Sequence, residues 1–315
     1  MNFAIIGAGM AGLACASALI RAGHRVTLFD KGRGPGGRMS TRRLSSPLGD
    51  VAIDHGAQYF TVRHPEFRQL VGQWHDQGVV APWPALSADA WIGTPGMNAV
   101  IRHMAADHHV VWGRAVAGRM RKDGQWWLID ETGASDPFDG LIVATPAEQA
   151  ASLLSLHDLA MARVAQTARS EPCWTTMLVF DKALANIAPV IRKKGMISWA
   201  SSNSAKPGRS GPEAWVVQAC AAWTLQHLET EPQDISPLLA QALFKVAGQP
   251  PQDPVHAVSH RWRYAIAAGT GDGALWNVDL GLGACGDWLL GPRVESAWLS
   301  GTLLARRCLG ADHSG

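Results

Sequence analysis

The 315-residue sequence predicts an α/β protein, chiefly from the order of segments near its N-terminus. An apolar run over 3–6 leads into a glycine-rich turn at 7–12, G-A-G-M-A-G, and a helical stretch follows from 13 to about 22. A second apolar run at 26–29 ends on Asp30. Strand, glycine-rich turn, helix and strand in this order are typical of a Rossmann-like dinucleotide-binding domain.

Each glycine of the turn has its own expected task. Gly7 permits the tight turn, Gly9 lets the backbone approach a pyrophosphate, and Gly12 permits close packing of the helix. A pyrophosphate would lie at the helix N-terminus, where backbone N–H groups are free to donate. Asp30 stands near the position at which an acidic side chain accepts hydrogen bonds from a ribose.

Composition argues against several classes of function. With 47% hydrophobic and 17% charged residues, the chain can bury a core. A net charge of +2 provides no general attraction to nucleic acid or anionic lipid, so we expect neither as a partner. The sequence shows no membrane span and no signal peptide, which favours a cytoplasmic location. It does not indicate the oligomeric state.

Cysteine and tryptophan usage adds two expectations. The five cysteines are odd in number and widely spaced, without a Cys-x-x-Cys pair or a His-rich neighbour, so we expect free thiols and no metal site. The fourteen tryptophans fit a Trp-rich core or an aromatic binding cavity.

A second glycine-rich segment, K-G-R-G-P-G-G-R-M-S-T-R-R at 31–43, follows the first closely and carries five Lys and Arg residues. Its glycines and guanidinium groups suit phosphate oxygens, although a solvated basic loop has the same composition. A nicotinamide dehydrogenase would normally continue to the next strand of its sheet here. One glycine-rich turn could serve any dinucleotide, whereas two in tandem indicate a more particular ligand.

Three later segments extend this pattern. The run 51–61 is strand-like and breaks at Gly56 into a polar and aromatic patch. The run 140–146 is an apolar strand that ends at a proline. The run 283–288 ends a strand with Asp287 and leads to a final helix, whose N-terminal amides could face an electron-rich cofactor group.

Together these segments resemble the flavin-containing amine oxidase superfamily, and most closely its bacterial renalase-like branch. The resemblance is strongest over 1–62 and 257–305 and weakest over about 150–250. It implies a glutathione-reductase-type FAD domain and a second, α+β substrate domain. The FAD domain would be discontinuous and comprise residues 1–65, 96–150 and 256–315, while the substrate domain would comprise residues 66–95 and 151–255.

The resemblance implies FAD as the cofactor. Its pyrophosphate would bind the first glycine turn, Arg38 would reach the phosphates, and Asp287 would contact the flavin side. We expect non-covalent binding because Cys285, the one cysteine near the C-terminal G-D-W segment, should be buried. The residues implied to bind FAD are Gly7, Gly9, Met10, Ala11, Gly12, Asp30, Lys31, Gly37, Arg38, His55, Gly56, Ala57, Val116, Gly286, Asp287, Arg293 and Val294.

Short strands are expected at 110–112, 114–120 and 125–129, the last two joined by a hairpin at 122–124. They look like the antiparallel meander that such FAD domains insert. By the same resemblance, Val116 would contact the adenine.

Gln58, Tyr59, Phe60 and Thr61 follow the turn implied to contact the flavin, and the resemblance places them toward the substrate. Alternatively, Tyr59 and Phe60 pack in a strand without contacting substrate. We regard Gln58, Tyr59 and His260 as the catalytic candidates, and His260 is either a base or a structural hydrogen-bonding group.

The strand around His260 reads S-H-R-W-R-Y-A and is similar to a family strand that enters the active site. Trp262 lies on the same strand face as His260 and is a candidate substrate contact. Thr94 and Asn203 are further candidates by resemblance, Asn203 as an amide donor. We cannot place the lysine that many amine oxidases set near the flavin, and this departure favours the renalase-like branch.

The family implies an FAD-dependent oxidase that takes hydride from dihydro isomers of NAD(P)H reduced at ring position 2 or 6. Its electrons would pass to O2, yielding NAD(P)+ and hydrogen peroxide. A dihydropyridine needs no general base, and aromatic side chains could stack on its ring. The alternatives are oxidation or desaturation of a small amine, or a flavoprotein without turnover.

Overall fold

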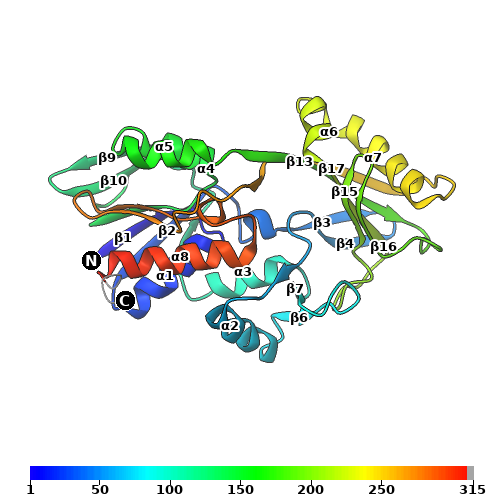
Figure 1. Cartoon of the computed structure of the whole chain (residues 1–315), viewed down its shortest axis with the longest axis horizontal. Coiled ribbons are helices and arrows are strands. Elements are labelled where there is room, and N and C mark those ends of the chain that lie inside the picture. The colour runs from blue at the N-terminus through cyan, green and yellow to red at the C-terminus, as the bar shows by residue number, and fades with distance from the viewer. Residues whose placement is uncertain (311–315) are drawn as a thin grey trace.

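The structure is a computed structural model that describes residues 1–310. One half of the molecule, here the cofactor half, contains a six-stranded sheet of order β18-β19-β12-β1-β2-β8 (Figure 1). The strands are β1 (Asn2–Ile6), β2 (Arg25–Asp30), β8 (His109–Trp112), β12 (Gly140–Val143), β18 (Leu275–Asn277) and β19 (Leu282–Ala284). All pairings are parallel except that between β18 and β19. The α/β Rossmann-like prediction is confirmed.

Helices cover both faces of this sheet because the side chains of β1 alternate between two cores. Phe3 and Ile5 pack with α1 (Met10–Arg21) and α8 (Val294–Cys308). Ala4 and Ile6 point the other way, into a second apolar core that three other elements complete. These elements are α4 (Ala147–Leu154), α5 (Leu159–Thr167) and the meander described below.

Helix α1 begins at Met10, three residues before the predicted start, because Gly9 takes the N-cap position. The last residues of the glycine turn therefore form the first helical turn. A Cβ on Gly12 would lie 2.0 Å from the carbonyl oxygen of Gly7, so the predicted packing role of Gly12 is confirmed.

The meander consists of β9 (Gly118–Lys122), β10 (Gln125–Asp130) and β11 (Gly133–Ala134), paired antiparallel. The prediction was wrong on two points. The segment at 110–112 belongs to β8, which joins the parallel sheet beside β2 and shields that edge with half-buried apolar side chains. Residues 114–117 form a loop, which leads into β9.

The second half contains a five-stranded antiparallel sheet of order β14-β15-β16-β13-β17. Its strands are β13 (Ser170–Phe180), β14 (Val190–Lys194), β15 (Ile197–Ser202), β16 (Glu213–Ala219) and β17 (His256–Ala267). Helices α6 (Ala221–Gln226) and α7 (Pro232–Ala247) accompany it. The hairpin of β3 (Thr41–Ser46) and β4 (Gly49–Asp54) packs against β13 and β16 through a small apolar core.

Another three-stranded sheet lies next to the cofactor half (Figure 1). It consists of β5 (Phe60–Thr61), β6 (Val80–Pro82) and β7 (Ala90–Gly93), and it is accompanied by α2 (Pro65–Asp76). Buried residues of this segment share one hydrophobic core with α1, α8 and α3 (Asn98–Ala105). The assignment of 66–95 to the substrate domain remains a prediction.

Tryptophans serve both expected purposes. Eight of the fourteen are buried, and two of these, Trp174 and Trp199, also line a cavity described below. Trp262 lines the same cavity. All five cysteines are free, and Cys285 is fully buried as expected. Within residues 1–310, the helices are too short or too polar to cross a membrane.

The crossing of α1 and α8 yields a stability prediction. A Cβ on Gly301 would lie 2.1 Å from the carbonyl oxygen of Ala11, and backbone cannot move aside cheaply. Gly301→Ala should therefore lower the free energy of unfolding by about 1–3 kcal/mol through overpacking. The control is Gly72→Ala in helix α2, where a Cβ meets nothing within 4 Å and the change should be neutral or stabilising. Urea unfolding of both variants measures the difference, and equal stabilities would contradict the prediction.

Candidate functional site

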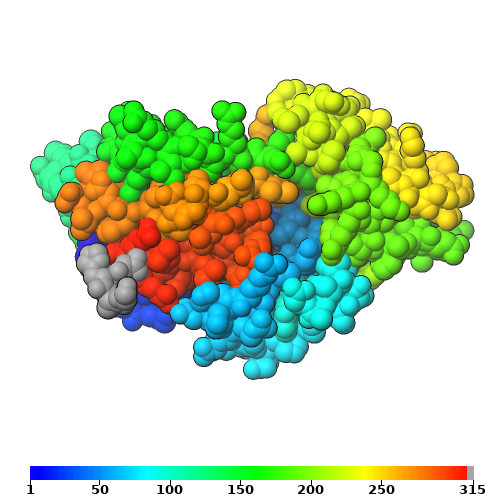
Figure 2. Space-filling view, viewed as in Figure 1, coloured from blue at the N-terminus to red at the C-terminus, as the bar shows by residue number. Residues whose placement is uncertain are grey.

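A cavity of about 1980 Å³ lies between the two halves, and we call it the site cavity. In Figure 2 the surface is hollowed between the orange and red C-terminal segments and the green second half, and blue N-terminal residues show at its base. The carboxyl ends of β1 and β2 open into the site cavity, where ligands of α/β sheets normally bind.

Most residues expected at the cofactor do line the site cavity. Fifteen of the seventeen do so, and the exceptions are Gly12 and His55, which lie directly behind its wall. The fifteen are Gly7, Gly9, Met10, Ala11, Asp30, Lys31, Gly37, Arg38, Gly56, Ala57, Val116, Gly286, Asp287, Arg293 and Val294. Their individual roles remain predictions.

The first glycine turn has the geometry that close approach of a ligand requires. Gly7 has φ +108°, and a Cβ there would lie 2.5 Å from the carbonyl oxygen of Ala144. Gly9 faces open space. The Asp30 carboxylate accepts from the backbone N–H of Ala8 at 2.8 Å and of Gly32 at 2.7 Å. Asp30 therefore links both glycine-rich turns, a role that we did not predict.

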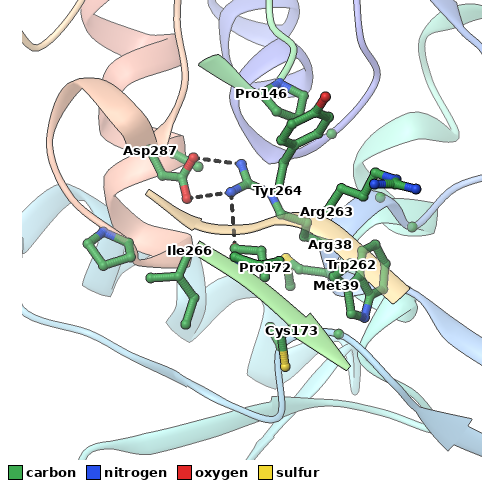
Figure 3. A pocket seen from close by; sticks show the side chains of 18 of the residues that line it. Arg38, Met39, Pro146, Pro172, Cys173, Trp262, Arg263, Tyr264, Ile266 and Asp287 are labelled. Atoms are coloured by element: carbon green, nitrogen blue, oxygen red, sulfur yellow. Dashed lines mark hydrogen bonds and ion pairs between the residues drawn. The ribbon is translucent and has the colours of Figure 1, made fainter. Parts of the chain in front are cut away.

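Arg38 and Asp287 form a two-pronged ion pair at 2.6 and 2.9 Å across the site cavity wall (Figure 3). The pair joins the second glycine-rich turn to the C-terminal segment, 249 residues apart in sequence. The Arg38 side chain remains 32% exposed, so it can still bind an anion while Asp287 orients it. Sequence reasoning chose both residues but missed their contact.

The turn at His55–Ala57 is fixed from three directions. A Cβ on Gly56 would lie 2.0 Å from the carbonyl oxygen of Arg38, which also accepts from the N–H of Ala57 at 2.8 Å. Gln218 donates to the Gly56 carbonyl at 2.9 Å, and Trp262 donates to the His55 carbonyl at 2.8 Å. This part of the wall is therefore preorganised.

The substrate candidates fall into two groups. Gln58, Tyr59, Phe60, Thr61 and Trp262 line the site cavity, whereas Thr94 and Asn203 are absent from the lining that residues 1–310 provide. Thr94 donates from Oγ1 to the carbonyl of Gly78 at 2.6 Å.

Asn203 has a structural position instead of the expected one. It is 1% exposed, its Oδ1 accepts from the Asp54 N–H at 3.2 Å, and its Nδ2 donates to the Ala52 carbonyl at 3.0 Å. Because both amide atoms bond to strand β4, the expectation of an amide donor to substrate is corrected. The sequence could not show this because the partners are distant along the chain.

Two neighbouring histidines at the site cavity favour their neutral forms. Burial, together with His260 and Arg42, lowers the pKa of His55 to about 3. Burial and Arg42 also lower the pKa of His260. The ring of His260 lies 4.4 Å from that of Trp262, and His55 Nδ1 is buried without a hydrogen-bond partner. A neutral imidazole can donate or accept one hydrogen bond at each nitrogen, so either proposed role of His260 remains chemically open.

An aromatic wall is built around Tyr59, one of the substrate candidates. Tyr59 stacks on Trp199 with ring centroids 5.3 Å apart, and Arg192 lies over both rings at 5.8 and 5.1 Å. We did not select Arg192 or Trp199 as site residues. The alternation of polar and apolar side chains in β14 and β15 does place them on defined faces, but it does not reveal that they reach Tyr59.

A buried ion cluster, also missed, lies behind Gln58. Asp54 Oδ2 accepts from Lys206 Nζ at 3.1 Å and from Arg209 at 2.5 Å, and the three side chains are 0%, 0% and 2% exposed. Burial alone would raise the pKa of Asp54, but the two cations outweigh it and lower the pKa to about 2. Burial lowers the pKa of Lys206 to about 8 against the opposing effect of Asp54.

Comparison with known proteins identifies the family. Residues 85–309 match the flavin containing amine oxidoreductase model, and residues 5–74 match an NAD(P)-binding Rossmann-like domain. The chain belongs to the flavin-containing amine oxidoreductase family. Within this flavoenzyme family it falls in the renalase-like branch, and mouse renalase is 26% identical over 290 residues, or 83% of this chain and 84% of the relative.

Solved structures support the same fold. Putrescine oxidase has a TM-score of 0.72 at 11% identity and covers 98% of this chain and 99% of its own. Cyclohexylamine oxidase from Brevibacterium oxydans has a TM-score of 0.71 at 13% identity and covers 99% of both chains. At these identities, the structures establish the fold alone.

FAD is the cofactor of this flavoenzyme, and the residues present fit it. The Gly7–Gly12 turn offers backbone N–H groups at the N-terminus of α1, and Gly9 leaves room for close approach of a pyrophosphate. Arg38 supplies a guanidinium from the second turn. FAD supplies a ring that accepts two electrons, while this chain's residues bind it, orient it and shape the space beside it.

The Arg38–Asp287 pair predicts how FAD affinity responds to mutation. Asp287→Asn removes the charge that orients Arg38, so FAD should bind about 10- to 100-fold more weakly, as expected for loss of a charged hydrogen-bonded partner. Titration of apoprotein with FAD, followed by flavin fluorescence, measures this. Glu66→Gln is the matched control, because Glu66 pairs with Arg306 on an exposed surface. Equal affinity of the Asp287 variant and wild type would rule out this orienting role.

The lowered pKa of Asp54 predicts an acid-side loss of stability. The carboxylate stabilises the fold above its ordinary pKa of 3.8, and this contribution disappears as pH falls through about 2. The loss should amount to about 2 kcal/mol of unfolding free energy.

Asp54→Asn tests this assignment. It leaves two buried cations without a counter-charge and should cost about 3–5 kcal/mol at pH 7. The difference between variant and wild type, measured by chemical unfolding, should shrink between pH 4 and 2. A difference that stays constant over this range would contradict the assignment.

Proposed function

We propose that this flavoenzyme takes hydride from dihydro isomers of NAD(P)H reduced at ring position 2 or 6, and passes the electrons to O2. The reaction consumes one dihydropyridine, one O2 and one proton, and it releases NAD(P)+ and H2O2. The similarity to renalase over most of both chains supports a substrate in this class. The charges that line the site cavity favour an anionic substrate over a cationic one.

Charge in the lining of the site cavity favours an anion over an amine. Carboxylates in the lining from residues 1–310 are confined to Asp30 and Asp287 in the cofactor turns and to Glu171 on β13. By contrast, Arg42, Arg63 and Lys193 line the site cavity and take part in no ion pair within those residues. An ammonium ion would meet repulsion there, whereas the phosphates of a dinucleotide would be attracted.

The remaining residues have positioning roles in this proposal. Tyr59, stacked on Trp199, offers a flat aromatic surface for a nicotinamide ring. Trp262 and His260 line the site cavity from β17. Neutral His260 provides a hydrogen bond without adding charge. The Gln58 amide is held by internal hydrogen bonds, so it contributes to the wall and does not transfer a proton.

Anaerobic mixing tests the proposal. The FAD-loaded protein is mixed with borohydride-reduced NAD+, which contains the dihydro isomers, and separately with ordinary NADH, putrescine and cyclohexylamine, while flavin absorbance is followed. Rapid bleaching by the isomer mixture alone, reversed by air with formation of peroxide, is the expected result. Bleaching by an amine would contradict the proposed substrate and indicate an amine oxidase activity. Slow reduction by every donor would support a flavoprotein without turnover.

The unpaired cations predict selective changes in KM. Lys193→Met should raise KM for a dihydro dinucleotide about 3- to 10-fold and leave a dihydronicotinamide riboside, which lacks phosphate, unaffected. Arg63→Met should act in the same direction. Lys194→Met is the matched control, since Lys194 is exposed and lies outside the site cavity lining. Equal effects on both substrates, or an equal effect of Lys194→Met, would contradict phosphate binding here. Steady-state kinetics at low and high salt measure these effects.

A further inference from the structure

The buried ion cluster behind Gln58 has more positive than negative charge. Asp54 contributes one carboxylate, whereas Lys206 and Arg209 contribute two cations, so the charged cluster has an excess of +1. The side chains that face Lys206 are Asp54 from β4, Arg209 from its own loop, Gln58, and Trp83, whose ring centroid is 5.5 Å away. A buried excess charge is costly unless it interacts with an opposite charge nearby.

Gln58 connects this cluster to the site cavity. Its Oε1 accepts from Lys206 Nζ at 2.9 Å and from Ser201 at 3.2 Å. Its Nε2 donates to the carbonyls of Asp54 at 2.7 Å and of Gly56 at 3.1 Å. These four bonds fix the orientation of the amide, with its oxygen toward Lys206 and its nitrogen toward the wall turn. The charge of Lys206 therefore lies one side chain behind the wall formed by Gly56 and Gln58.

Reduction of the flavin supplies a matching negative charge. When an oxidised flavin accepts a hydride, two electrons and one proton enter the ring system, and its charge becomes more negative by one unit. A fixed positive charge near this site stabilises that product without reorganisation, because Lys206 is already held by Asp54 and Gln58.

We propose that Lys206 is a positioning residue of the flavin site, which orients Gln58 and whose buried charge favours the reduced form of bound FAD. The inference rests on the proposed hydride acceptance by this site, and it deepens that function by naming a residue behind the wall that tunes the cofactor. It does not depend on which substrate supplies the hydride.

Titration of Lys206 should change how the reduction potential of bound FAD depends on pH. Its pKa of about 8 means that the side chain is charged below this pH and neutral above it. As pH rises through about 8, the excess positive charge is lost and the reduced flavin loses stabilisation. The reduction potential should therefore fall more steeply with pH in this region. Arg209 lowers the pKa of Lys206, so removal of Arg209 should move this change to higher pH.

The experiment measures the two-electron reduction potential of bound FAD from pH 6 to 10 by equilibration with redox dyes. Lys206→Met should weaken the preference for reduced over oxidised FAD at least tenfold at pH 7, a fall of about 30 mV, and abolish the inflection near pH 8. Lys206→Arg keeps the charge and should retain the potential without the inflection. Arg209→Met should keep the inflection at a higher pH. Lys245→Met, on the exposed side of α7, is the control for loss of one positive charge and should change nothing.

The variants separate tuning from a purely structural role. A Lys206→Met protein with the wild-type potential and pH profile would overturn the proposal, even if it unfolded more easily. If this variant fails to fold, unchanged inflections in Lys206→Arg and Arg209→Met would overturn it instead. Because dyes replace the substrate, these results are independent of the donor tests. Failure of the dihydro isomers to bleach the flavin would contradict the proposed function and leave this inference standing.

Discussion

The structure depends on a single buried carboxylate, that of Asp54. Besides Lys206 and Arg209, it accepts from Thr41 Oγ1 at 2.7 Å and from the backbone N–H of Met97 at 2.9 Å. These partners come from the β3–β4 hairpin, the start of α3 and the loop after β15. One charge thus joins three segments that are far apart in the sequence, at Thr41, at Met97 and at 206–209, behind Gln58 in the wall of the site cavity. A neutral side chain could not satisfy so many donors at once.

The two ends of the site cavity are built in different ways. At the cofactor end, glycines let the backbone lie close to the ligand. The Arg38–Asp287 pair joins the second glycine-rich turn to the C-terminal segment there. At the other end, side chains on sheet strands supply aromatic surface and positive charge. The first arrangement suits any FAD enzyme, while in the proposed function the second determines which donor can approach.

Features encoded within a short stretch of chain were predictable from the sequence. The order of β1, α1 and β2, the packing of Gly12 and the buried strand β12 all follow from local spacing and turn chemistry. Long-range pairings were not predictable. The neighbour of β8 depends on which sheet edge remains open, and the amide of Asn203 is occupied by a strand about 150 residues away, as its bonds to Ala52 and Asp54 show. The Lys206 cluster was missed for the same reason, since its members have no shared sequence pattern.

The paired strands β13 and β17 have a mechanical consequence for the enzyme. They are 11 and 12 residues long and pair along most of their length, with one register shift between Glu171 and Cys173, from the second sheet to the region beside the cofactor half (Figure 1). A hydrogen-bonded ladder of this length resists bending far more than a flexible linker does. We therefore expect the two halves to behave as one stiff frame during turnover, with substrates distinguished by their fit to a preformed space and not by closure of one half over the other.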